Sequence, residues 1–109
     1  MRPRLGPGLE GEAAAMVVAV GTADLWIESS QSLKDRRRVV RSLADRLKAR
    51  LNVSVAELEE PFSWQRARLA VACVSQTEAQ ARAVMDQARR LVEGNAEAEL
   101  TQFEVSFYC

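Results

Sequence analysis

The feature that most constrains the fold is the order of two hydrophobic periodicities along the chain. Residues 16–28, 52–59 and 97–108 alternate between apolar and polar positions, which is typical of strands with one buried face. Residues 64–75 are almost wholly apolar after Arg68, as expected of a central strand. The sequence therefore predicts four strands.

Two helices are predicted between these strands. After Ser32, leucine and valine recur every three or four positions, and Ser32 with Asp35 resembles a capping box. Thr77 and Gln80 form a second capping box, and Gly94 is a stop signal for that helix. The order strand-helix-strand-strand-helix-strand predicts an α+β, ferredoxin-like domain: a four-stranded antiparallel sheet with both helices on one face.

The ends of the chain are expected to differ from its middle. Residues 1–15 hold two of the three prolines and three of the five glycines, so we expect a disordered extension before a single domain over residues 16–109. Gly21 interrupts the first predicted strand and suggests a bulge or a bend there. No apolar run is long enough to cross a membrane.

The sequence offers little for catalysis. It contains no histidine, no glycine-rich phosphate loop and no metal-ligand motif, so we expect no enzyme, no catalytic residue, no metal and no cofactor. The densest carboxylates are Glu57, Glu59 and Glu60, which we interpret as an exposed strand end and turn. Cys73 in an apolar run and Cys109 at the end form no CxxC pair, which favours a reducing cytoplasm.

Positive charge is concentrated in the first predicted helix. Residues 34–50 carry eight of the 15 basic residues against two acidic ones, a net charge of +6. Residues 76–109 carry three arginines against six acids, a net charge of −3. The overall charge of zero therefore conceals a strong asymmetry.

Five cations of this helix share one face. At ~100° per residue they fall opposite the apolar stripe, interrupted only by Asp45. They are Lys34, Arg37, Arg38, Arg41 and Lys48. This basic stripe predicts binding to phosphates or RNA; the alternative is a solvated amphipathic helix whose charge is offset elsewhere. Arg36 projects nearer the apolar side, where its stem can pack while its guanidinium reaches the sheet edge.

The face of the sheet without helices carries a second candidate surface. Apolar residues are expected on it at five positions: Val18, Val20, Ala70, Ala72 and Val74. An uncovered apolar patch usually marks an interface, so we expect a homodimer through this apolar patch, with Asp24 and Arg68 paired nearby. Trp26 and Trp64 lie only at strand ends, beside Arg66, so bases are not expected to stack on the middle of the sheet.

Three blocks carry a resemblance to a known family: SLKDRRRVVRSL at residues 32–43, NVSVAE at 52–57 and WQRA at 64–67. The chain resembles the YlxP-like family of small bacterial proteins of unknown function. The resemblance implies a ferredoxin-like fold and a gene neighbourhood of translation genes, including that for ribosome-binding factor A. The family motif's basic positions correspond to Lys34, Arg36 and Arg37, and its indole block to residues 64–66.

Two functions follow as expectations. The first is a non-enzymatic, cytoplasmic accessory protein that binds RNA or the ribosome through the basic stripe, with Arg36, Trp64 and Arg66 as secondary contacts. The alternative is a homodimeric scaffold, or a module that binds a small ligand or a protein, without a nucleic-acid role.

Overall fold

A computed structural model describes residues 16–58 and 63–108 of this protein. The extension predicted over residues 1–15, the carboxylates of Glu59 and Glu60, and the thiol of Cys109 lie outside the described residues.

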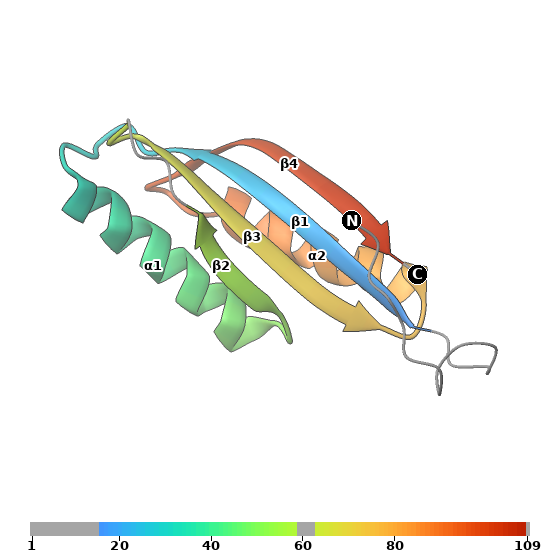
Figure 1. Cartoon of the computed structure of the whole chain (residues 1–109). Helices are drawn as coiled ribbons and strands as arrows, with labels where there is room; N and C mark the ends of the chain where they lie inside the picture. Colours follow the sequence, from blue (N-terminus) through green and yellow to red (C-terminus); the bar gives the residue numbers. More distant parts are fainter. Residues whose placement is uncertain (1–15, 59–62, 109) are drawn as a thin grey trace.

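The described chain folds into one four-stranded sheet and two helices (Figure 1). In chain order the elements are β1 (Val17–Trp26), α1 (Leu33–Arg50), β2 (Ser54–Leu58), β3 (Arg66–Ser75), α2 (Glu78–Glu93) and β4 (Glu99–Tyr108). The strands lie in the order β2-β3-β1-β4, and every neighbouring pair is antiparallel. This confirms the predicted α+β, ferredoxin-like fold.

Both helices cover the same face of the sheet. α1 packs on β2 and β3, and α2 packs on β1, β3 and β4; Figure 1 shows α2 behind β1 and β4. Burial alternates strictly along β1, because every second side chain faces the helices. The fully buried centre includes Leu43 and Leu47 from α1, Leu69 and Val71 from β3, and Met85 from α2. The opposite face of the sheet is covered by neither helix.

Side-chain caps begin both helices as the sequence predicts. The Ser32 hydroxyl accepts a hydrogen bond of 3.0 Å from the backbone N–H of Asp35. The Thr77 hydroxyl accepts one of 3.1 Å from the N–H of Gln80. These bonds satisfy N–H groups that the first turn of a helix leaves without partners. Neither helix of the described chain is long and apolar enough to span a membrane.

The prediction of a bulge at Gly21 is wrong. Gly21 pairs in unbroken register with Val71 of β3 and Val105 of β4, and the register shift in the β1–β4 pair falls between Asp24 and Leu25. Gly21 has a packing role instead. A Cβ atom there would lie 2.8 Å from the Phe103 ring and 3.0 Å from the Met85 sulfur, so the missing side chain makes room for two larger ones.

Candidate nucleic-acid interface

Helix α1 exposes nearly all of its positive charge. Of its eight lysines and arginines, seven are exposed and Arg36 is buried. The five residues of the basic stripe lie on the side of the helix away from the core residues Val40, Leu43 and Leu47. Arg46 and Arg50 lie nearer the core side, where they line a hollow against α2. The amphipathic pattern therefore produces the charged outer surface that the sequence predicts.

Three members of the basic stripe have carboxylate partners. Arg38 Nη2 lies 2.9 Å from Glu97 Oε2, and Arg41 Nε lies 2.9 Å from Glu57 Oε2. Lys48 Nζ lies 3.7 Å from Asp45 Oδ1, within the helix. These contacts neutralise part of the stripe, and Glu57 is thereby placed in an ion pair.

The hydrogen bond and the charge of Glu97 raise the pKa of the Arg38 guanidinium above its already high ordinary value. The group with the raised pKa stays protonated until the pH rises through that value. Arg38 therefore remains a cation at every pH at which RNA binding would be measured.

The other four exposed cations of α1 form no ion pair with any group in residues 16–58 or 63–108: Lys34, Arg37, Arg46 and Arg50. Only the first two belong to the predicted stripe. Within the stripe, the unpaired cations Lys34 and Arg37 therefore lie at the N-terminal end, and the paired ones follow them along the helix. These four residues, which we call the open cations, provide the positive charge that is most accessible to an anion.

Arg36 belongs to the fold rather than to the surface. Its side chain is buried, and Nη1 donates a hydrogen bond of 2.6 Å to the carbonyl of Ser63, with a longer contact of 3.4 Å to that of Arg66. The guanidinium thus ties α1 to the start of β3, as the helical position of Arg36 suggests. We therefore leave Arg36 out of the interface.

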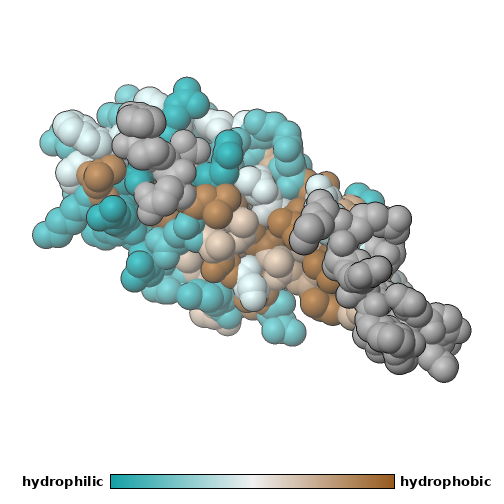
Figure 2. All heavy atoms as spheres, in the orientation of Figure 1, coloured by the Kyte–Doolittle hydropathy of each residue, from teal (hydrophilic) through white to brown (hydrophobic). Residues whose placement is uncertain are grey.

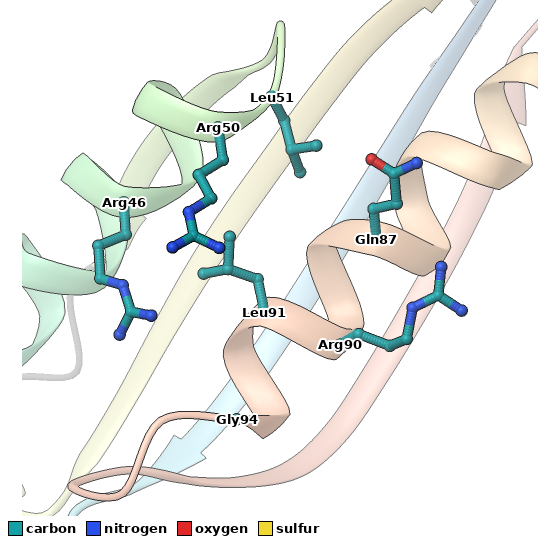
Figure 3. A pocket seen from close by; sticks show the side chains of 7 residues that line it. All are labelled: Arg46, Arg50, Leu51, Gln87, Arg90, Leu91 and Gly94. Atoms are coloured by element: carbon teal, nitrogen blue, oxygen red, sulfur yellow. The ribbon is translucent and has the colours of Figure 1, made fainter.

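The structure adds a residue that the sequence did not indicate. Arg90 of α2 lines one hollow together with Arg46 and Arg50 of α1, near the C-terminal ends of both helices (Figure 3). Arg90 lies in the segment with net negative charge, and the sequence does not show that α2 brings it beside α1. A basic residue in the last turn of a helix is favoured by the helix dipole, and this is the one feature of Arg90 that its sequence position shows.

The remaining secondary candidates lie at the start of β3, where the Arg36 guanidinium of α1 contacts the backbone. Trp64 is 55% exposed just before β3. Arg66 is exposed and pairs in register with Trp26 of β1, whose indole N–H donates a hydrogen bond of 2.6 Å to Glu28. Burial alternates along β3 and Ala67 faces the helices, so the Arg66 side chain lies on the sheet face opposite α1 and its basic stripe.

The five apolar patch residues lie on the sheet face that the helices leave open. Val18, Val20, Ala70 and Ala72 are half-buried, and Val74 is 66% exposed. Figure 2 shows hydrophobic atoms gathered along the middle of the molecule with hydrophilic atoms around them. At the edge of the patch Arg68 Nε lies 2.6 Å from Asp24 Oδ1, which confirms the predicted pair.

No group of three metal-ligating side chains occurs among the residues that the structure describes. Cys73 is a buried thiol on the core side of β3.

Comparison with known proteins places the chain in a family. A family model described as "Protein of unknown function (DUF503)" matches residues 18–105, which span all six elements except the ends of β1 and β4. The chain belongs to this DUF503 family. It is also similar to a protein of Bacillus subtilis (strain 168) named "Uncharacterized protein YlxP", with 28% identity over 85 residues, 78% of this chain and 92% of that protein. The resemblance to YlxP-like proteins is thus confirmed, and the name of neither the family nor the Bacillus protein states an activity.

Proposed function

We propose that this protein is a non-enzymatic, cytoplasmic accessory protein that binds RNA through the exposed cations of α1. The observation that carries the proposal is the set of four open cations on one helix, with no carboxylate partner in the described residues. Phosphodiesters supply the complementary charge, and arginine guanidinium groups match phosphate oxygens in a two-pronged geometry. The gene neighbourhood implied by the family resemblance makes ribosomal RNA the first RNA to examine.

The cations with partners also support this proposal. Both the Arg41 side chain and its partner Glu57 are partly open to water, at 66% and 34% exposure. Exposed ion pairs stabilise proteins only slightly because water screens them. A phosphate can therefore displace Glu57 from Arg41, although the carboxylate then remains nearby and weakens the contact.

The test is binding of a fluorescently labelled, single-stranded oligouridylate to the full-length protein, measured by anisotropy. The variant K34Q/R37Q removes two open cations at the exposed N-terminal half of α1. Two lost phosphate contacts are expected to weaken binding about 25-fold at roughly 0.1 M salt.

The matched control is R82Q/R89Q, which removes the same charge from α2. Arg82 and Arg89 already lie 3.7 Å and 2.7 Å from the carboxylates of Glu78 and Glu93. The control should bind nearly as the wild type does. If both variants weaken RNA binding equally, net charge alone governs binding, and α1 is not the specific binding surface.

A second candidate function is homodimerisation through the apolar patch. We propose a second copy of the chain as the occupant because the patch has both charge signs at its edge, in Asp24 and Arg68. In a two-fold arrangement the Asp24–Arg68 ion pair of one copy can meet the same pair of the other with opposite charges facing, so the surface is complementary to itself. The exposed Val74 would then be covered.

Sedimentation velocity over a concentration series tests the dimer. The wild type should sediment as a dimer at high micromolar concentration, and Val74→Asp should sediment as a monomer because it places a charge within the apolar contact. Ala83→Asp, at an exposed position of α2 on the opposite side of the sheet, is the control and should leave the dimer intact. A wild type that remains monomeric would exclude this function.

A further inference from the structure

The hollow between the C-terminal halves of α1 and α2 has the composition of a ligand site. Its volume is about 430 Å³, within the usual range for small-molecule sites. Seven residues line it: Arg46, Arg50, Leu51, Gln87, Arg90, Leu91 and Gly94. Both helices contribute, so the site exists only in the folded chain.

Within the part of the chain that the structure describes, the arginines of the hollow have no carboxylate partner. None of the lining residues is acidic, and Arg46, Arg50 and Arg90 form no ion pair within the described residues. Arg46 and Arg50 extend side by side from α1 toward Leu91 (Figure 3), so their like charges repel each other. An anion bound in the hollow would relieve this repulsion.

The rest of the lining is apolar or uncharged. Leu51 and Leu91 are half-buried, and the Gln87 side chain offers both a hydrogen-bond donor and an acceptor. Figure 3 shows Arg46 and Arg50 extending from α1 toward Leu91, with Gln87 and Arg90 on the other side of that leucine. Cationic groups therefore flank an apolar surface that an inorganic anion would leave uncovered.

We propose that this hollow binds one nucleotide unit of single-stranded RNA. The phosphate lies against the guanidinium groups, the base covers Leu51 and Leu91, and Gln87 donates to or accepts from the base edge. A base in a duplex is stacked and paired, so only a single strand can place one there. This inference rests on the proposed RNA binding and assigns it a nucleotide-sized subsite at the end of α1.

The binding test compares three proteins with labelled single-stranded oligouridylate: the wild type, R50Q/R90Q, and the control R82Q/R89Q. R50Q/R90Q removes one guanidinium from each helix without adding a charge of opposite sign. Since one phosphate contact is lost, we expect binding to R50Q/R90Q to be about 5-fold weaker than to the control at roughly 0.1 M salt. A thermal melt checks that each variant is folded.

A second measurement uses the wild type alone and does not depend on the folding of a variant. Methyl resonances of the leucines are followed by NMR during titration with uridine monophosphate and, separately, with inorganic phosphate. We expect uridine monophosphate to shift the methyl groups of Leu51 and Leu91, and inorganic phosphate to leave them nearly unchanged. Equal shifts with both would overturn a site for the base.

Failure of this inference and failure of the proposed function give different results. If the wild type binds oligouridylate and R50Q/R90Q binds it as well as the control, the hollow is excluded while RNA binding by α1 stands. If the wild type does not bind RNA, both proposals fail. If a poly-glutamate peptide displaces the RNA as effectively as unlabelled RNA does, the hollow recognises acidic polypeptides and the inference is overturned.

Discussion

At the scale of single residues, Arg36 and Arg37 illustrate how adjacent cations take different roles. The Arg36 side chain is 5% exposed and donates to backbone carbonyls at the start of β3, while Arg37 is exposed. One residue along a helix turns a side chain by about 100°, which is enough to move it from the sheet edge to the solvent.

We predict that Arg36→Ala lowers the free energy of unfolding by about 1–3 kcal/mol, because the partly buried hydrogen bonds to the carbonyls at the start of β3 and the packing of the buried side chain are lost. Arg37→Ala, the control, should change it by no more than about 0.5 kcal/mol. Urea denaturation measures both. A loss of stability that is the same for the two variants would contradict the assignment of Arg36 to the fold.

The role of Gly21 is a residue-level feature that could not be predicted from the sequence. Its place in an alternating strand identifies an unusual position, and a bulge is one reason for glycine in a strand. The actual reason is the approach of Phe103 from β4 and Met85 from α2. Both residues are more than 60 positions away in sequence, so no local pattern could indicate that contact.

At the scale of elements, the periodicities were sufficient to predict all four strands and both helices, because burial of one face sets the repeat in each. The same periodicity correctly placed the cations of α1 on its outer side. The periodicity could not show which of these cations would form ion pairs with carboxylates. Glu57 on β2 and Glu97 before β4 reach Arg41 and Arg38 only after the chain has folded back on itself.

These two carboxylates compete with RNA, so we predict that E57Q/E97Q binds single-stranded RNA more tightly than the wild type. Two additional phosphate contacts would raise the affinity by up to about 25-fold at roughly 0.1 M salt. Anisotropy with labelled oligouridylate measures the change, and E78Q/E93Q, which frees cations of α2 instead, is the control. Unchanged affinity in E57Q/E97Q would show that the middle of α1 does not contact RNA.

At the scale of the whole molecule, the fold places its two candidate surfaces on opposite sides. α1 and α2 carry exposed cations on the helical side, and the apolar patch occupies the uncovered face of the sheet. RNA binding and dimerisation therefore do not exclude each other, and a dimer would present two copies of α1. The sequence predicted both surfaces, but the hollow with Arg90 depends on the packing of two helices and was not predictable from one of them.

The most direct test of the account is the salt dependence of RNA binding by the wild type. Anisotropy of labelled single-stranded oligouridylate is measured over a salt series, and the logarithm of the association constant is plotted against the logarithm of the salt concentration. If each open cation contacts one phosphate, the slope should be about −2.8 or steeper. The open cations are Lys34, Arg37, Arg46 and Arg50. A slope near zero, or no binding at low salt, would contradict the claim that α1 is an RNA-binding surface.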